Sequence, residues 1–407
     1  MSVDIVKSVR DCFPIFKNKI NGKSLSYLDN AAITQVPDVM ISSLDNFYRN
    51  INANVHRGAY SLSELATEKY EGTRIKISKY IGASDPSECI FVKGTTEGIN
   101  LVSNSYLRPR LMPGDEVLIS YMEHHSNIVP WYLLCKELKA KLKVIPILQS
   151  GELDYSVIPS LLTSRTKLFA ITHISNSLGT VNDLKYLINI SHSKNIPILI
   201  DGAQSLSNGF INVKELDCDF YTLSSHKMFG PNGLGVLYVK KKILEKMVPY
   251  QGGGDMIKQV SFSNITWNDC PYKFEAGTPS IANVVAFGET IDFLKNLDLK
   301  SLFLYKKELF DYACSELLKI PGVKFIGSPK HRAEILSFIL EGIHPHDVGT
   351  IANHYGVAVR TGHHCSMPVM DFFGVSSTVR MSLSIYNTEE DISKLVYSIN
   401  KAKKVFF

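Results

Sequence analysis

The stretch Asp219–Lys240, DFYTLSSHKMFGPNGLGVLYVK, predicts two β-strands joined by a polar, glycine-rich turn. Its ends, Asp219–Ser224 and Val236–Lys240, are short runs of mainly β-branched and aromatic residues, as is typical of buried strands. Because the glycines of the turn lead into a strand and not a helix, the turn is neither a Walker loop nor a dinucleotide-binding fingerprint. Glycines let a backbone approach a flat ligand closely. Lys227 directly follows the first strand, where a partly desolvated amine can lose its proton and form a Schiff base; a solvated surface group is the alternative.

Upstream of this stretch, short apolar runs alternate with amphipathic segments such as Glu97–Ser105 and Val181–Ser193. This alternation predicts an α/β fold in which helices cover both faces of a mainly parallel sheet. Ligands bind such sheets at the carboxyl ends of the strands. The other expected strands are Cys89–Lys93, Glu116–Ser120, Leu142–Ile147, Leu168–His173 and Ile196–Asp201.

Polar residues follow several of these strands. Gly94-Thr95-Thr96-Glu97 opens a helix, and its free N–H groups and hydroxyls suit a phosphate monoester, with a plain helix cap as the alternative. Asp201 ends an apolar run, where a carboxylate is costly to bury unless it is paired; here too a helix cap is the alternative. His124 offers a ring that can stack on a flat ligand, or is a surface histidine. With Lys227, these groups supply a phosphate cradle, a partner for a pyridinium nitrogen and a Schiff-base amine, which together predict pyridoxal 5′-phosphate (PLP).

The composition of the chain argues against several classes of protein. The 407 residues are 45% hydrophobic and 20% charged, which is ordinary for a globular protein of two or three domains. Neither a membrane-spanning run nor a secretory signal is recognisable, so we expect a cytoplasmic protein that does not insert into a membrane. The net charge of +5 comes from scattered lysines without interleaved aromatic residues, which argues against nucleic-acid binding. Seven cysteines without a C-x-x-C motif argue against a disulfide framework and a zinc ribbon.

The last third of the chain predicts a second, smaller unit. Residues 251–280 are rich in Gly, Asn, Ser and Pro with little periodicity, and we expect a long functional loop there. Helices at Ile281–Leu297 and Ser301–Ile320 follow, and a last helix is capped by Asn387-Thr388. Expected strands lie at Leu336–Leu340, Val357–Thr361 and Val379–Ser384. We therefore expect a large PLP-binding domain (23–294), a small αβ domain (295–407) and an N-terminal segment (1–22) that packs on the small domain.

Eight specific motifs lie along the chain: NVHRG (Asn54–Gly58), GTTEGIN (Gly94–Asn100), MEHHSNIVPW (Met122–Trp131), THISNSLGT (Thr172–Thr180), DGAQS (Asp201–Ser205), SSHKMFGPNGLG (Ser224–Gly235), FEAGTP (Phe274–Pro279) and RTGHHCSMP (Arg360–Pro368). In these motifs the chain resembles the group II cysteine desulfurases of the SUF system, which are class V aminotransferase-fold enzymes closely related to selenocysteine lyases. The resemblance runs nearly end to end, from Tyr27–Ala32 to Tyr386–Thr388.

The resemblance implies a PLP-dependent transferase of fold type I, with a seven-stranded sheet, PLP as cofactor and a homodimer as the active form. It implies that Lys227 forms the Schiff base, Asp201 pairs with the pyridinium nitrogen, Gln204 bonds the phenolic oxygen and His124 stacks on the ring. It assigns the phosphate to Thr95, Thr96, Ser224 and His226, with Thr278 of a second subunit. For the substrate, it implies that Asn176 and Arg380 hold the carboxylate and that Arg360 lies near the sulfur.

The last motif, Arg360–Pro368, contains His363-His364-Cys365. Adjacent residues on an extended backbone point in different directions, and no fourth ligand stands at a usual spacing, so we expect no metal site. The resemblance makes Cys365 the nucleophile, its thiolate favoured by neighbouring cations, that takes the sulfur of L-cysteine, releases alanine and passes the sulfur to a SUF acceptor protein for iron–sulfur assembly. The short loop ending at Pro368 fits group II, because group I members carry this cysteine on a longer, mobile loop.

Three alternatives stay open at this point. A selenocysteine lyase, acting on L-selenocysteine, would use the same site. An ordinary aminotransferase on this fold would need no thiol, so Cys365 argues against it. A phosphate-binding or scaffold protein would hold no chromophore. One loop departs from the family pattern: Gln251 stands where an acid is expected and Asp255 where a small polar residue is expected.

Overall fold

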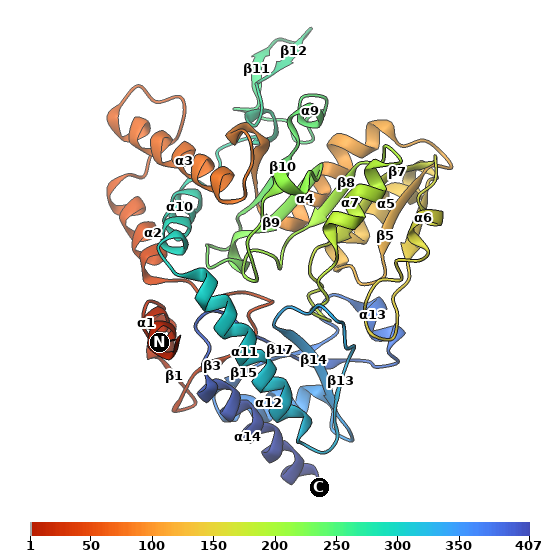
Figure 1. Ribbon diagram of the computed structural model, residues 1–407. Coiled ribbons are helices and arrows are strands. Elements are labelled where there is room, and N and C mark those ends of the chain that lie inside the picture. Colours follow the sequence, from red (N-terminus) through yellow and green to blue (C-terminus); the bar gives the residue numbers. More distant parts are fainter. Residues whose placement is uncertain (1) are drawn as a thin grey trace.

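Seven strands form the central sheet in the computed structural model, which describes residues 2–407. Strand β10 is antiparallel to both of its neighbours and the other strands run parallel to one another, which confirms the predicted mainly parallel sheet (Figure 1). In spatial order the strands are β4 (Cys89–Val92), β10 (Gly235–Val239), β9 (Phe220–Ser224), β8 (Ile198–Asp201), β7 (Thr166–Thr172), β5 (Glu116–Ser120) and β6 (Lys141–Ile145).

Helices cover both faces of this sheet because most of its strands are apolar on both sides. In β8, Ile198 and Ile200 face one hydrophobic cluster, and Leu199 faces the other. The first cluster lies under α3 (Ser61–Tyr80), α7 (Leu184–His192) and α10 (Ile281–Lys295), and α10 in turn packs on α2 (Asp38–Asn50). The second lies under α4 (Thr95–Leu101), its π-helical continuation Val102–Leu107, and α5 (Val129–Leu138). Shorter helices are α6 (Ile158–Leu161), α8 (Val213–Leu216) and α9 (Lys241–Leu244).

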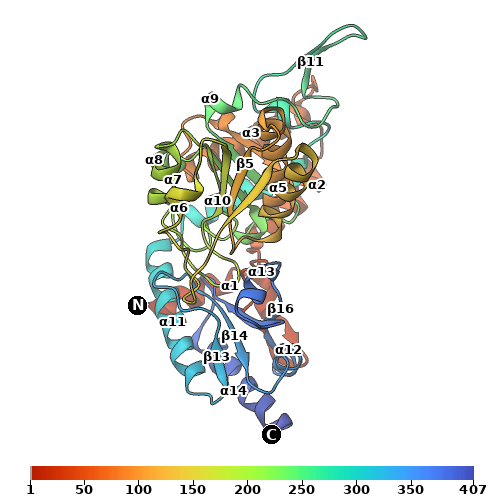
Figure 2. The ribbon, with the colours of Figure 1, turned by 90° about the vertical axis from the view of Figure 1, so that its right-hand side faces the viewer.

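A second, antiparallel sheet lies below the first in Figures 1 and 2. Its order is β13 (Val323–Phe325), β14 (Ile335–Leu340), β17 (Thr378–Ser382) and β16 (Arg360–Gly362). The helices of this smaller unit are α11 (Leu299–Leu318), α12 (Pro345–His354), α13 (Met367–Phe372) and α14 (Glu389–Phe406). A capping box starts α14, in which the Thr388 side chain accepts from the N–H of Asp391 and the Asp391 carboxylate accepts from the N–H of Thr388.

The N-terminal residues contact this smaller unit at several points. Helix α1 (Ser2–Asp11) contacts α11, and the Arg10 guanidinium lies 3.0 Å from the Asp391 carboxylate. The strand expected at Val357–Thr361 is divided, because β15 (Val357–Ala358) pairs in parallel with β3 (Ser26–Tyr27) whereas β16 pairs with β17. A further small hairpin joins β1 (Lys19–Ile20) to β2 (Lys23–Ser24).

The expectation of a loop without regular structure at 251–280 is wrong. Strands β11 (Ile257–Val260) and β12 (Ile265–Trp267) form a hairpin that projects from the large sheet's end of the molecule (Figure 2). Val260, Phe262, Ile265 and Trp267 are exposed on it, and Phe262 is fully exposed. Apolar and polar residues alternate at Val260–Ser263 and Ile265–Trp267, but these runs are short within a segment that is otherwise rich in Gly, Asn, Ser and Pro.

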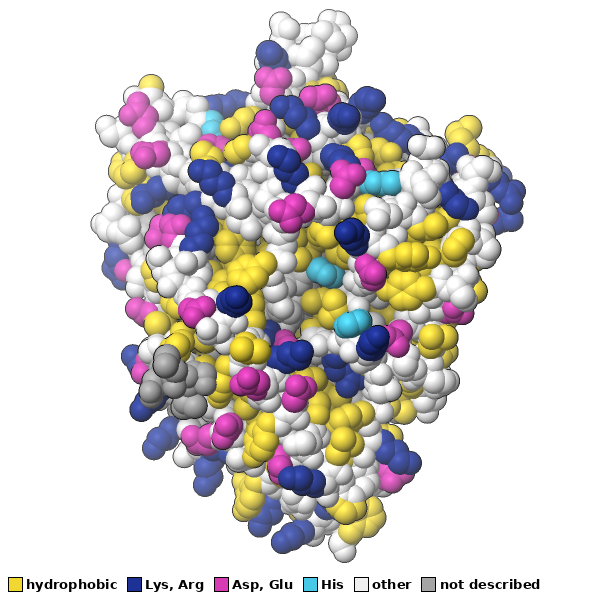
Figure 3. Space-filling model, viewed as in Figure 1, with side chains coloured by type: hydrophobic (Ala, Val, Ile, Leu, Met, Phe, Trp, Pro, Cys, Tyr) yellow, Lys and Arg dark blue, Asp and Glu magenta, His cyan; other side chains and the backbone are white. Residues whose placement is uncertain are grey.

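The surface carries mixed charge. On the face drawn in Figure 3, cationic and anionic side chains are interspersed, without a continuous basic area. Within residues 2–407, no helix combines the length and the apolarity needed to cross a bilayer.

Candidate active site

A cavity of about 210 Å³ lies at the carboxyl ends of the large-sheet strands, where the sheet faces the smaller unit. Eleven of the thirteen residues predicted for the site line it, and only Cys365 and Thr278 do not. The eleven are Thr95, Thr96, His124, Asn176, Asp201, Gln204, Ser224, His226, Lys227, Arg360 and Arg380.

Hydroxyl groups gather at one end of the cavity, where α4 begins. The Ser224 hydroxyl accepts from the Thr95 N–H at 2.9 Å and lies 2.9 Å from the Thr95 hydroxyl. The Thr96 hydroxyl lies 2.7 Å from that of Ser126, which also lines the cavity. These hydroxyls and the first N–H groups of α4 form a set of donors for a phosphate group.

The glycines of the Lys227 turn have packing and conformational reasons of their own. A Cβ on Gly235 would lie 2.4 Å from the Leu223 carbonyl oxygen, and one on Gly230 would lie 2.7 Å from the Phe287 ring. Gly233 has φ +72°, which disfavours other residues. Packing and turn geometry are therefore sufficient to explain glycine at these positions.

Asp201 and Lys227 are buried at the centre of the site. Burial raises the pKa of the Asp201 carboxyl above its ordinary value, against the effects of the Ala203 N–H and the Lys227 charge. Burial lowers the pKa of Lys227, and the Asp201 carboxylate opposes that shift. The Asp201 carboxylate accepts from the Ala203 N–H at 2.9 Å, its only hydrogen bond among the described residues. A buried carboxylate with spare acceptor capacity fits a protonated pyridine nitrogen, and the amine fits the aldehyde carbon of PLP.

The His124 ring is neutral in this site. Burial and the nearby cations Lys227, Arg380 and Arg360 lower its pKa to about 3, with His125 adding to the effect. Its Nδ1 accepts from the Ser126 N–H at 3.1 Å, which fixes the ring orientation. The Gln204 amide donates to the Ala31 carbonyl at 2.6 Å and keeps its oxygen and a second N–H for other partners.

The far end of the cavity is cationic. Arg360 on β16 and Arg380 on β17 are paired across the small sheet. Arg380 is 2% exposed; it donates to the Asp29 carboxylate at 2.8 Å and to the Asn176 carbonyl at 3.0 Å, and its buried Nε has no partner. Asp29 is not among the predicted site residues, although it lies in the Tyr27–Ala32 motif that contributes to the resemblance.

Cys365 lies on a tight turn, not on the extended backbone that the sequence argument assumed. His364 has φ +53° and Cys365 has φ +56°, both in the left-handed region that non-glycine residues rarely adopt. The Asn176 amide donates to the His364 carbonyl at 2.7 Å, and the His125 N–H donates to the Cys365 carbonyl at 2.8 Å. The turn presents a half-buried thiol close enough to Lys227 that a thiolate would raise the lysine pKa.

His364 does not share a ligand geometry with its neighbours. Its buried imidazole Nε2 lies 2.7 Å from the Thr378 hydroxyl. Over the described part of the chain, no group of three or more His, Cys, Asp or Glu side chains is arranged to hold a metal ion.

Thr278 lies outside this cavity. It lines a separate cavity of about 390 Å³ together with Gln251, Glu275 and Tyr70. Its own subunit therefore does not bring it to the hydroxyl-rich end of the site.

Comparisons with known proteins agree along nearly the whole chain. The family model described as aminotransferase class-V matches residues 26–395. The chain is 46% identical to a cysteine desulfurase of Wigglesworthia glossinidia brevipalpis and 44% identical to one of Escherichia coli O139:H28, each over 401 residues that cover 98% of both chains.

Two solved structures share the fold. A crystal structure of an E. coli cysteine desulfurase superposes with a TM-score of 0.92 at 34% identity, covering 99% of both chains. The apo structure of a cysteine desulfurase from Thermococcus onnurineus NA1 gives a TM-score of 0.93 at 33% identity, covering 98% of both. The chain therefore belongs to the class V aminotransferase family of PLP-dependent enzymes.

Proposed function

We propose that the protein is a cysteine desulfurase that converts L-cysteine to L-alanine and carries the removed sulfur as a persulfide on Cys365. The observation that carries this proposal is a thiol on a left-handed turn, next to His364, which lines the same cavity as Lys227, Arg360 and Arg380, and near enough to Lys227 to affect its pKa. The similar cysteine desulfurases, aligned over 98% of the chain, support it.

Several residues of the chain are suited to hold the cofactor. Asp201 would face the pyridine nitrogen, Gln204 the phenolic oxygen and His124 the ring, while Thr95, Thr96, Ser224 and His226 would hold the phosphate. Bound there, PLP supplies an electron sink that labilises the bonds at the Cα of an amino acid.

The protein's side chains supply the remaining steps. Arg380 and Asn176 bind the substrate carboxylate, and Arg360 lies beside the sulfur-bearing group. The buried Lys227 amine, whose pKa is lowered, moves the proton at Cα. The Cys365 thiolate then attacks the substrate Sγ, so that an S–S bond forms as the Cβ–Sγ bond breaks. The carbon skeleton gains a proton and leaves as alanine, so cysteine and one thiol give alanine and one persulfide.

The proposed active form is a homodimer with shared sites. Thr278 lines a cavity apart from its own site, which supports a role at the phosphate of a second subunit. The exposed apolar side chains of the β11–β12 hairpin, in the same segment, support burial against another chain. In this proposal Gln251, which lines the cavity with Thr278, and Asp255, paired with Arg57 at 2.9 Å, belong to the interface.

The finer assignments are also proposals. The short Cys365 turn supports the group II, SUF-type subtype, with a SUF acceptor protein receiving the sulfur. All seven cysteines are free, which fits a reducing compartment such as the cytoplasm. The proposed domains are the large PLP-binding domain 23–294 and the small domain 295–407, with residues 1–22 packed on the latter, as the contact between α1 and α11 supports.

The test is product analysis on the PLP-loaded protein. With L-cysteine we expect alanine in stoichiometric amount and a persulfide on Cys365 by mass spectrometry of alkylated peptides. An aminotransferase would instead form a keto acid and need an amino-group acceptor, and that outcome would overturn the proposal. A parallel assay with L-selenocysteine measures whether the main role is that of a selenocysteine lyase.

A further inference from the structure

Lys306 on α11 is the centre of a buried polar cluster outside the cavity. Its side chain is 1% exposed. The ammonium lies 2.8 Å from the Glu334 carboxylate and donates to the Ser207 carbonyl at 2.8 Å and to the Asn208 side-chain oxygen at 2.7 Å. An ammonium has three protons, so this set of three acceptors satisfies it completely.

Burying this ion pair is costly in free energy. Removing an ammonium and a carboxylate from water carries a desolvation penalty that their attraction only partly offsets, and apolar replacements of similar volume are often neutral or stabilising. Glu334 is also buried, at 8% exposed. Stability alone is therefore a poor explanation for the pair, whereas fixing the geometry of the segments that it joins is a role that an apolar contact fills less well.

On one side, hydrogen bonds connect the cluster to the loop after β8, which contains Gln204. Ser207 and Asn208 lie in the loop between β8, which ends at Asp201, and α8, which starts at Val213. The Asn208 amide donates to the Gln204 carbonyl at 2.6 Å, and the Gln204 side chain in turn donates to the Ala31 carbonyl at 2.6 Å. Two hydrogen bonds therefore connect the Lys306 ammonium to the backbone of Gln204.

On the other side, Glu334 connects the cluster to the small sheet. Glu334 directly precedes β14, and its carbonyl accepts from the Leu383 N–H at 2.9 Å, just beyond the end of β17. Ser337 on β14 is paired with Arg380 on β17. Glu334 is thus anchored to the two strands that place the arginine at the substrate end.

We propose that Lys306 and Glu334 are positioning residues that fix the Asp201–Asn208 loop, and with it the PLP ring, relative to the strand that carries Arg380. The inference rests on the proposed roles of Asp201, Gln204 and Arg380. Lys306 touches neither cofactor nor substrate and acts through Asn208 and Gln204.

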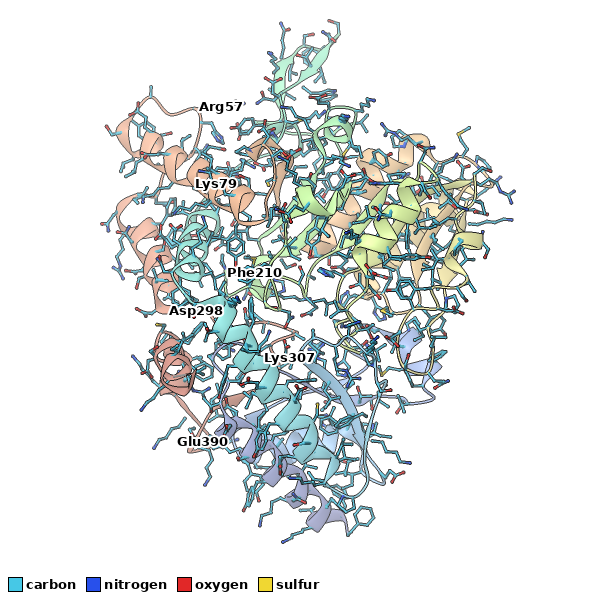
Figure 4. All side chains as sticks on the ribbon, in the orientation of Figure 1. Arg57, Lys79, Phe210, Asp298, Lys307 and Glu390 are labelled. Atoms are coloured by element: carbon cyan, nitrogen blue, oxygen red, sulfur yellow. The ribbon has the colours of Figure 1, made fainter. Side chains whose placement is uncertain are left out.

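The decisive variant replaces both charges, Lys306→Met with Glu334→Leu, because either single change leaves an unpaired buried charge or an unsatisfied ammonium. Lys307→Met is the matched control, since Lys307 is the next residue of α11 and is exposed; it is labelled in Figure 4. Folding is followed by far-UV circular dichroism and thermal melting. PLP affinity is measured by titrating the apoprotein, and ring geometry by the visible circular dichroism of the bound cofactor.

We expect the double variant to fold with a melting temperature near that of the wild type. We also expect its PLP dissociation constant to rise about tenfold or more, its visible circular dichroism to change and its KM for L-cysteine to rise, with Lys307→Met unchanged throughout. Wild-type PLP affinity and dichroism in a folded double variant would overturn the proposal. Loss of the fold in the double variant would overturn it as well, because the pair would then be needed for folding itself. The PLP measurements use no substrate, so an error in the proposed desulfurase activity would leave them unaffected.

Discussion

The Asn176 side-chain amide donates to the backbone carbonyl of His364 at 2.7 Å, so a residue proposed to bind the substrate carboxylate also holds the turn that carries Cys365. The Ser366 hydroxyl donates to the Asn176 side-chain oxygen at 3.1 Å, on the other side of the same turn. Under the proposed function, substrate binding and placement of the nucleophile therefore depend on one side chain.

This relationship predicts different effects for two substitutions. Asn176→Ala should raise the KM for L-cysteine and lower kcat, with kcat/KM falling about 100-fold. The substitution removes a proposed substrate contact and the hydrogen bonds that connect Asn176 to the Cys365 turn. Ser366→Ala removes only the hydrogen bond from Ser366 to Asn176, so it should lower kcat about tenfold with little change in KM. Steady-state alanine release measures both. An unchanged kcat in Ser366→Ala would show that the hydrogen bond from Ser366 to Asn176 is not needed to place the Cys365 turn.

Cys365→Ala should separate sulfur from selenium chemistry. Removing sulfur from cysteine needs a thiolate acceptor, so turnover of L-cysteine should fall by several orders of magnitude. A selenol is a better leaving group, so much of the activity on L-selenocysteine should remain, and PLP should still bind. Alanine release from both substrates is the measurement.

The matched control for this substitution is Cys135→Ala, a buried thiol on α5 that should leave cysteine turnover nearly unchanged. A persulfide found on any of the other six cysteines would contradict the role given to Cys365.

Lys227→Ala should abolish turnover and remove the Schiff-base absorbance, while the fold remains. In the wild type, borohydride reduction followed by peptide mapping should place the cofactor on Lys227. Lys242→Ala, at an exposed lysine of α9, is the control and should retain full absorbance. A cofactor adduct on another lysine would disprove the assignment.

Shared active sites predict complementation between two inactive chains. A Thr278→Ala chain should bind PLP weakly through loss of a phosphate contact, and a Lys227→Ala chain should be inactive. Mixed dimers of the two should regain activity, because one of their two sites contains both native residues. Fully active protein that sediments as a monomer would exclude this arrangement.

The buried His173 should contribute to the pH dependence of the free energy of unfolding. Burial lowers its pKa to about 4, whereas the unfolded chain has the ordinary value of about 6.5. Between these values the unfolded state binds more protons, so the free energy of unfolding falls as the pH is lowered through this range, by about 1 kcal/mol between pH 7.5 and pH 5.5. In urea unfolding, the free energies of unfolding at pH 7.5 and pH 5.5 should differ less for His173→Gln than for the wild type. The exposed His331→Gln should behave as the wild type.

The strands of the large sheet were predictable because their apolar runs are buried on both faces, as β8 is. The hydroxyls of Thr95 and Thr96, Asp201 and Lys227 follow such strands, so the topology alone brings them to one edge. The β11–β12 hairpin escaped prediction because it is not buried, so its sequence carries no core pattern.

Other features depend on tertiary contacts that no local pattern carries. The left-handed turn at His364 and Cys365 is imposed by hydrogen bonds from Asn176 and His125, which lie far away in sequence. The Lys306 cluster joins residues 99 positions apart, between helix and loop, and a single lysine in an amphipathic helix gives no sign of it.

The ion pair of Asp29 with Arg380 joins positions 351 residues apart, and it sets the order in which the site can form during synthesis. A nascent chain exposes Asp29 early and Lys227 near its midpoint, but it lacks Arg380, which is proposed to bind the substrate carboxylate, until β17 has left the ribosome. Contacts of such long range also close slowly, since much of the chain must be ordered first. The residues proposed to bind PLP are therefore encoded well before Arg380, and a truncated chain that ends before β17 contains Lys227 but lacks the residue proposed to select the substrate.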